Sequence, residues 1–365
     1  MSIWRFADAI EDVPADSRIS LGEGDTPLIR SRQIGPAAGL KNLYFKLEMA
    51  NPCGSFKDRF AAAAISHMIA AGQTECIATS SGNTGAALAA YCAAAGIRCR
   101  IAIVETAPFG KVKQMLAYGA DIFRVNGFGL DADITSNAFA ALQKLGSQPG
   151  RALQISGYVF SPKGMSGCQT VSHELAEQLP DGIDHVFCPA GGGGLCVGAA
   201  RGFHTLVSRG VLERSPAVEV VQPEGNNTIA GPLAEGQPQA QPITCTSKIS
   251  GLQVASVVDG DLAIEECRPT GGTGHLVTDE FIWEVQKRLA REEGIFSEPA
   301  GAVALAGALS AARAGRVDPD ATIVCLVTGS GFKDEASLDR MIADVDCPMI
   351  DVGQLQEEAE VSGES

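Results

Sequence analysis

The stretch Asn51-Pro52-Cys53-Gly54-Ser55-Phe56-Lys57-Asp58-Arg59 combines a turn signal, Asn-Pro with a glycine, with the start of a helix. Ser55 and Asp58 fit the Ser/Thr-x-x-Asp/Glu capping pattern, and the alanine-rich run 60–71 continues as a helix. Lys57 is therefore expected in the first helical turn, near the positive end of the helix dipole and partly desolvated. Both effects lower the pKa of a lysine, and only a neutral amine can attack an aldehyde. On this stretch alone, a solvated lysine among the 28 lysines and arginines is the competing interpretation.

Around this stretch, apolar runs typical of buried strands alternate with alanine-rich helical windows. The expected strands are 76–78, 100–104, 185–188 and 322–327, and the expected helices are 84–95, 110–119, 195–207 and 300–313. Such alternation predicts an α/β fold with mainly parallel sheets flanked by helices. Ligands collect at the carboxyl ends of parallel strands, so the glycine-rich segments that follow these strands are expected to form the binding site.

The composition limits the function further. With 365 residues, of which 45% are hydrophobic and 19% charged, the chain is long enough for two domains. A net charge of −15 argues against nucleic acid and anionic membranes as partners. We find no signal-peptide pattern at the N-terminus and no apolar stretch of membrane-spanning length, so a cytoplasmic location is expected. The eleven cysteines form no C-x-x-C pair and show no zinc-like spacing with histidine, which predicts a reducing compartment and no metal site.

Two of the glycine-rich segments follow predicted strands and open predicted helices. The segment 79–85 reads Thr-Ser-Ser-Gly-Asn-Thr-Gly, and its backbone N–H groups with the hydroxyls of Ser80, Ser81 and Thr84 suit an amino-acid carboxylate, although a plain N-cap turn is the alternative. The segment 189–195 contains Gly191, Gly192, Gly193 and Gly194, which allow close approach of a phosphate. This second segment lacks the spacing of a dinucleotide fingerprint and the lysine of a P-loop, so a small phosphate monoester fits better.

With the segment Val327-Thr328-Gly329-Ser330-Gly331-Phe332-Lys333-Asp334, these motifs resemble the fold-type II pyridoxal-phosphate enzymes, and most closely the threonine synthase family. The resemblance covers nearly the whole chain. It implies two domains with the cofactor in the cleft between them. Residues 1–60 and 156–350 would form the large domain, 61–155 an inserted small and mobile domain, and 351–365 an acidic disordered tail. A homodimer is the family's usual assembly.

The same resemblance implies roles for single residues. Lys57 would form the Schiff base with pyridoxal phosphate, Asn83 would contact the cofactor hydroxyl, and the glycines 191–194 would hold its phosphate. Thr328 would face the pyridine nitrogen. A hydroxyl there is a weak, neutral partner for the nitrogen, so the ring is a milder electron sink than it would be with a carboxylate partner. A milder sink favours elimination and replacement at the side-chain carbons.

The stretch Ser161-Pro162-Lys163-Gly164 departs from the family pattern, because glycine stands where threonine synthases carry an arginine for the substrate phosphate. Loss of that contact removes about 1.5–3 kcal/mol. Lys163 is a candidate to replace the arginine, but its ammonium is a point charge and lacks the planar pair of donors that a guanidinium offers to a phosphate. Lys111 and Lys113 are further candidates for an anionic substrate group, with solvated helix-face lysines as the equal alternative.

These features predict a threonine synthase-like lyase for β- or γ-elimination or replacement on a small L-amino acid, diverged from O-phosphohomoserine. Threonine synthase proper, a threonine or serine ammonia-lyase and a cysteine synthase-like enzyme are the enzymatic alternatives. A catalytically silent pyridoxal-phosphate-binding protein and a nucleotide-binding protein with an incidental Lys57 are the alternatives outside this chemistry.

Overall fold

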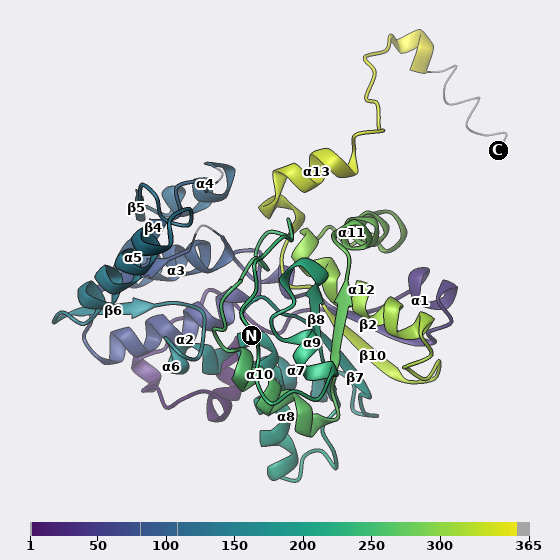
Figure 1. Ribbon diagram of the computed structural model, residues 1–365, viewed down its shortest axis with the longest axis horizontal. Helices are drawn as coiled ribbons and strands as arrows, with labels where there is room; N and C mark the ends of the chain where they lie inside the picture. The colour runs from purple at the N-terminus through teal and green to yellow at the C-terminus, as the bar shows by residue number, and fades with distance from the viewer. Residues whose placement is uncertain (1, 81, 108, 356–365) are drawn as a thin grey trace.

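The chain forms two sheets, each flanked by helices (Figure 1). The computed structural model describes residues 2–80, 82–107 and 109–355. The larger sheet has six strands in the order β1-β2-β10-β7-β8-β9. Its strands are β1 (Leu28–Arg30), β2 (Asn42–Lys46), β7 (His185–Pro189), β8 (Ala217–Pro223), β9 (Gly274–Val277) and β10 (Thr322–Leu326). Only the edge strand β1 runs antiparallel to its neighbour among these strand pairs.

The smaller sheet has four parallel strands in the order β5-β4-β3-β6. These are β3 (Glu75–Thr79), β4 (Arg98–Ile103), β5 (Asp121–Arg124) and β6 (Arg151–Gln154). All four lie within the range 61–155. The mobility of that range, and its status as a separate domain, stay predictions.

The α-helices connect the strands and cover the sheets. They are α1 (Ile34–Ala37), α2 (Lys57–Ala70), α3 (Asn83–Ala95), α4 (Phe109–Ala117), α5 (Ala132–Gly146), α6 (Pro162–Met165), α7 (Thr170–Gln178), α8 (Gly194–Ser208), α9 (Ala230–Ala234), α10 (Gly260–Cys267), α11 (Asp279–Glu293), α12 (Pro299–Arg313) and α13 (Glu335–Met341). Among the described residues, no helix combines the length and apolar character needed to span a bilayer. The α/β class predicted from the alternation is confirmed.

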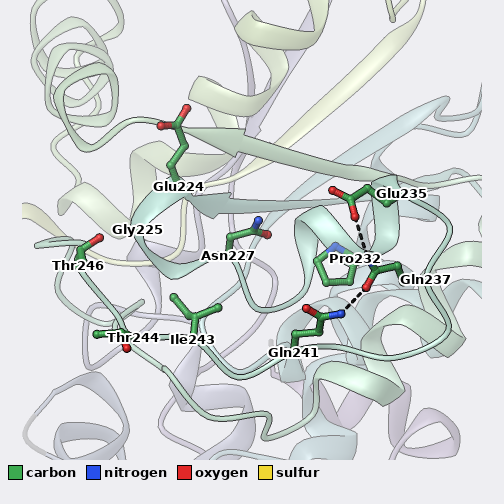
Figure 2. Close-up of a pocket in the computed structure, with 10 residues that line it drawn as sticks. All are labelled: Glu224, Gly225, Asn227, Pro232, Glu235, Gln237, Gln241, Ile243, Thr244 and Thr246. Carbon is green, nitrogen blue, oxygen red and sulfur yellow. Dashed lines mark hydrogen bonds between the residues drawn. The ribbon is translucent and has the colours of Figure 1, made fainter.

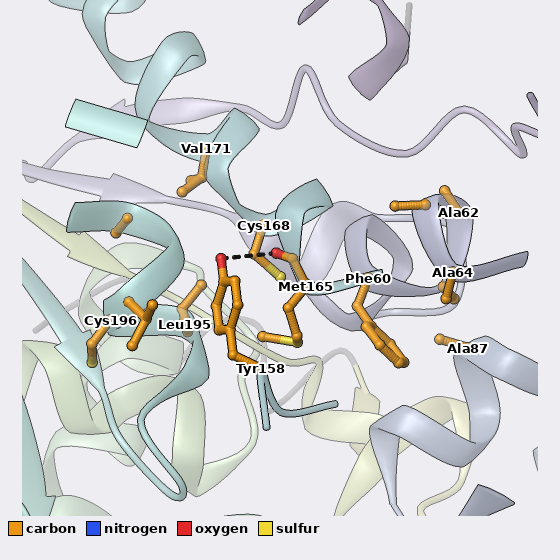
Figure 3. Packing of buried hydrophobic residues seen from close by; sticks show 14 of the residues in the cluster. Phe60, Ala62, Ala64, Ala87, Tyr158, Met165, Cys168, Val171, Leu195 and Cys196 are labelled. Atoms are coloured by element: carbon orange, nitrogen blue, oxygen red, sulfur yellow. Dashed lines mark hydrogen bonds between the residues drawn. The ribbon is translucent and has the colours of Figure 1, made fainter. Parts of the chain in front are cut away.

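Both faces of the larger sheet are buried, as expected for parallel strands. Along β7, Val186 and Cys188 belong to one hydrophobic cluster, whereas Phe187 between them belongs to the other. Successive side chains of a strand point to opposite faces, so the two clusters lie on opposite sides of the sheet. Helices α11 and α12 complete one cluster, and α2, α7 and α8 contribute to the other. Figure 3 shows part of this second cluster, where Phe60, Met165 and Tyr158 pack between α2 and α8.

A buried ion-pair network fixes the start of α2 to the larger sheet. The Arg59 guanidinium binds Glu48 (Nη2–Oε1 2.7 Å) and Glu174 (Nη1–Oε1 2.6 Å), and Lys46 Nζ lies 2.6 Å from Glu174 Oε2. All four side chains are buried, so each charge depends on its partners for stability. Arg59 is two residues from Lys57, and the network therefore also positions the lysine.

The expected cap of α2 is wrong. The N-cap residue is Phe56, which makes no side-chain cap bond. Asp58 Oδ2 instead accepts a hydrogen bond from the Cys53 backbone N–H at 3.0 Å. Gly54, between these two residues, has φ +84°, a conformation that favours glycine.

The C-terminal segment after α13 leads away from both sheets (Figure 1). Residues 342–355 are all exposed. The predicted acidic tail, 351–365, lies outside the described residues from 356 onward.

Candidate active site

The predicted site segments follow the carboxyl ends of parallel strands. Strand β3 leads into Ser80 and α3, β7 leads into the glycines 191–194 and α8, and β10 leads into Thr328. These segments belong to both sheet regions, and they contact one another near Lys57.

Lys57 is the first residue of α2, and burial desolvates its amine. Its Nζ donates a hydrogen bond to Ser156 Oγ at 3.0 Å and lies 4.3 Å from the centre of the Phe56 ring. Burial lowers the pKa of Lys57, although Cys168, Asp259 and Glu298 act in the opposite direction. The direction agrees with the expectation from sequence, and it increases the fraction of the nucleophilic, neutral amine.

Ser156 joins Lys57 to two other segments. Its Oγ lies 2.7 Å from Thr84 Oγ1, which is buried in the first turn of α3. Its backbone carbonyl oxygen lies 3.8 Å from the point where a Cβ on Gly194 would stand. The predicted carboxylate nest, the glycine loop and the lysine therefore surround one serine.

The Lys57 and Thr328 segments lie side by side. The Phe56 backbone N–H donates to the Thr328 carbonyl oxygen at 3.1 Å, and Ser55 and Gly329 form an antiparallel bridge. Thr328 is buried, with 4% of its surface exposed. The loop after β10 and the loop before α2 thus form a continuous wall beside Lys57.

Asn83 reaches the same wall through Glu298. Its Nδ2 donates to Glu298 Oε1 at 2.7 Å, and the Glu298 backbone N–H donates to the Gly329 carbonyl oxygen at 3.0 Å. Asn83 opens α3 beside the smaller sheet, whereas Glu298 precedes α12 on the larger one. This hydrogen bond spans the two sheet regions.

The glycine loop leaves the start of α8 open to a ligand. The N-cap residue is Gly193 at φ +96°, and no side chain caps the first N–H groups. A Cβ on Gly193 would lie 3.0 Å from Ala263 Cβ, and one on Gly194 would lie 2.7 Å from Met165 Cε. Larger residues would therefore not fit, and the free N–H groups suit an anion.

Asp259 holds this loop to the turn that carries Ser156. Its carboxylate accepts hydrogen bonds from the backbone N–H groups of Tyr158 (2.8 Å) and Val159 (3.1 Å). Its own N–H donates to the Gly192 carbonyl oxygen at 2.9 Å. Burial raises the pKa of Asp259 despite these two donors.

The other predicted substrate residues do not contact Lys57 among the described residues, or they lie outside the part of the chain that the structure describes. Lys163 is exposed on α6, and its charge helps to lower the pKa of His67, after the larger effect of burial. His67 is ten residues after Lys57 in α2, so about 15 Å of helix separates these two residues. Lys113 is exposed, with Nζ 3.7 Å from Glu335 Oε1. Ser81 and the side chain of Lys111 are outside the described residues.

The sequence interpretation missed Ser156 and gave no role to Glu298. Ser156 follows strand β6, which was not predicted, so the residue had no strand end to mark it. The Ser-Gly pair at 156–157, after the short run 151–154, was the available signal.

A separate hollow of about 350 Å³ opens beside the loop that follows β8 (Figure 2). Its lining is polar and includes Glu224, Asn227, Glu235, Gln237 and Gln241. None of the predicted site residues lines it.

Known proteins resemble this chain over most of its length. A family model described as "Pyridoxal-phosphate dependent enzyme" matches residues 19–329. The threonine synthase of Methanocaldococcus jannaschii is 32% identical over 337 residues, which cover 92% of this chain and 81% of that protein. The threonine synthase of Mycobacterium leprae is 32% identical over 317 residues, covering 87% and 84%.

Solved structures share the fold. Maize serine racemase matches with a TM-score of 0.70 and 25% identity, covering 100% of this chain and 98% of the racemase. Threonine deaminase isoform 2 of Solanum lycopersicum matches with a TM-score of 0.73 over 94% of both chains, at 22% identity.

Proposed function

This chain belongs to the family of pyridoxal-phosphate dependent enzymes, and on that premise we propose that it is a threonine synthase-like lyase. It eliminates or replaces a leaving group at the β- or γ-carbon of a small hydroxy- or O-activated L-amino acid. The observation that carries this proposal is the Lys57–Ser156–Thr84 chain of hydrogen bonds, which links a lysine of lowered pKa to the proposed carboxylate nest.

The residues present fit the cofactor. Lys57 would hold its aldehyde, and the uncapped N–H groups at the start of α8, with glycines 191–194, would hold its phosphate. Asn83 and Thr328 would contact the ring from opposite sheet regions. Pyridoxal phosphate, when bound, supplies an electron sink for negative charge at the substrate α-carbon.

The chain's own residues would then perform binding and proton transfer. Ser80 and Thr84, with the backbone N–H groups of the 79–85 segment, orient the substrate carboxylate; Ser81 belongs to the same proposal. Neutral Lys57 Nζ takes the proton from the α-carbon and can return it to another carbon. Ser156 keeps the amine oriented by accepting its hydrogen bond.

A steric feature at Gly164 supports a substrate other than the usual phosphate ester. A Cβ at this position would lie 2.8 Å from Phe60 Cε2 and 2.8 Å from Ala64 Cβ. Because α6 packs this closely on α2, an arginine cannot occupy the position without a shift of the helix. Any anionic leaving group must be held by other residues, and Lys111, Lys113 and Lys163 remain proposals for that role.

Threonine synthase proper is the second candidate, with O-phosphohomoserine converted to threonine and phosphate. It is favoured by the threonine synthases that are 32% identical over more than four fifths of this chain. The other two alternatives, an ammonia-lyase and a cysteine synthase-like enzyme, differ from threonine synthase in their products.

One assay distinguishes these candidates. The purified enzyme, loaded with pyridoxal phosphate, is offered O-phosphohomoserine, threonine, serine, hydroxyaspartate and O-acetylserine, and phosphate, ammonia and 2-oxo acid are measured together. We expect turnover of a substrate without a phosphate. Rapid and exclusive conversion of O-phosphohomoserine to threonine would establish the second candidate instead. Cofactor binding without turnover of any amino acid would contradict both candidates and identify a silent binding protein.

We also propose a homodimer in the cytoplasm, with residues 61–155 moving as a unit against the larger part. Light scattering coupled to size-exclusion chromatography measures the first property. Hydrogen exchange with and without substrate measures the last.

A further inference from the structure

Three cysteines without a metal-binding spacing in the sequence lie together where helix α3 packs on the smaller sheet. Cys76 on β3 and Cys99 on β4 are directly paired positions of the smaller sheet, and Cys92 lies on α3, which packs on these strands (Figure 1). Their three Sγ atoms all lie within 4.8 Å of one another. The residues are 0%, 0% and 5% exposed for Cys76, Cys92 and Cys99, so the cluster is sealed from solvent.

The sulfur spacing suits one shared ion. Thiolates around a single centre with bonds of about 2.3 Å stand about 4 Å apart. Small rotations of the three side chains are enough to reach that spacing from the observed one.

The charge of the complex selects among soft ions. Zn²⁺ in structural sites takes four ligands, and with three thiolates it would carry a net charge of −1. A net charge in a sealed apolar core is costly. A trivalent centre with three thiolates is neutral and needs no fourth ligand.

We propose that Cys76, Cys92 and Cys99 form a three-sulfur site for a trivalent metalloid of the arsenite type. Arsenous acid exchanges its three hydroxyl groups for the three sulfurs. Three As–O bonds break, three As–S bonds form, and the three thiol protons leave with the hydroxyl groups as water. Arsenic stays trivalent throughout, so no oxidant or reductant takes part.

Occupancy of this site would bind three elements into one unit. Cys76 lies three residues before the end of β3, and α3 begins at Asn83. The bound centre would therefore cross-link the strands to the helix that carries Asn83 and Thr84. Because the cluster is sealed, entry requires local opening of α3, and binding is slow in the native protein.

The test uses the full-length enzyme loaded with pyridoxal phosphate and incubated with sodium arsenite after removal of reductant. We expect one arsenic per chain to remain after gel filtration, three sulfurs and no oxygen around arsenic by X-ray absorption, and a raised unfolding temperature. Binding should accelerate in low urea, because opening limits entry. Refolding the chain in the presence of arsenite should give the same stoichiometry without the delay.

The variant Cys92→Ala suits the test because α3 is rich in alanine on both sides of Cys92. It should lose the three-sulfur signal. Cys196→Ala is the matched control, since this cysteine is also buried in a helix but lies outside the cluster. If Cys92→Ala does not fold, Cys99→Ser replaces it. Equal arsenic binding by the cluster variant and the control would overturn the proposal, as would two sulfurs with oxygen in the absorption spectrum or no retained arsenic after refolding. Tighter retention of Zn²⁺ than of arsenite would overturn the selection by charge.

Discussion

Lys57 Nζ and Ser156 Oγ are 3.0 Å apart, although 99 residues separate them along the chain. The hydroxyl is the hydrogen-bond partner of the amine that the proposed chemistry requires, and it also contacts Thr84. We therefore expect replacement of Ser156 and replacement of Lys57 to have different effects on turnover.

Ser156→Ala should retain the cofactor but turn over about 10- to 100-fold more slowly, because a hydrogen bond to a charged group contributes about 1.5–3 kcal/mol. The apparent pKa assigned to Lys57 in the pH–rate profile should fall, since the ammonium form loses its acceptor. Ser208→Ala, on the exposed end of α8, is the control. An unchanged rate and pH profile would show that Ser156 does not orient the amine.

Lys57→Ala should abolish turnover and the visible absorbance of covalently held cofactor. Borohydride treatment of the loaded wild-type enzyme should attach the cofactor to the peptide that contains Lys57, as measured by mass spectrometry. Lys144→Ala removes an exposed lysine of α5 and should behave as wild type. Full activity in Lys57→Ala would remove the basis of the proposed function.

Gly164→Arg should not create a phosphate site. The new side chain would collide with Phe60 and Ala64, so we expect a loss of about 1–3 kcal/mol in the free energy of unfolding. Urea unfolding measures this change, and Lys163→Arg at the exposed neighbouring position should show almost none. A stable Gly164→Arg enzyme that prefers O-phosphohomoserine would contradict the steric argument.

The buried ion pairs predict loss of stability in acid. Burial disfavours the charged form of Glu174, but Arg59 and then Lys46 outweigh it and lower the pKa of Glu174 to about 2. A carboxyl group whose pKa is lower in the folded state stabilises that state above the unfolded value of 4.5, and this contribution is lost as the pH falls toward 2.

Urea unfolding at a series of pH values tests this. Wild type should weaken steadily below pH 4.5. Glu174→Gln should be less stable at neutral pH by about 3–5 kcal/mol, because it leaves Arg59 and Lys46 short of a partner, and its curve should depend less on pH. Parallel curves for the two proteins would show that the group does not titrate in this range.

Much of the fold could be predicted because its signals are local. The predicted helix 84–95 is α3, and the predicted helix 300–313 is α12, with boundaries within one residue. Both are alanine-rich and buried, so periodicity and composition agree. Strands β5 and β6 were missed, because their residues are only partly buried and form no continuous apolar run.

The amino-acid sequence by itself determined the class of the protein: strand–helix alternation, glycine loops at strand ends, and a lysine at a helix start are patterns of neighbouring residues. Only the tertiary structure decided which side chains share a site. Ser156 contacts Lys57, Glu298 contacts Asn83, and the three clustered cysteines lie together, because contacts between separate elements depend on how the two sheets and their helices pack. Packing also excluded an arginine at Gly164, since the space there is set by Phe60 and Ala64 of another helix.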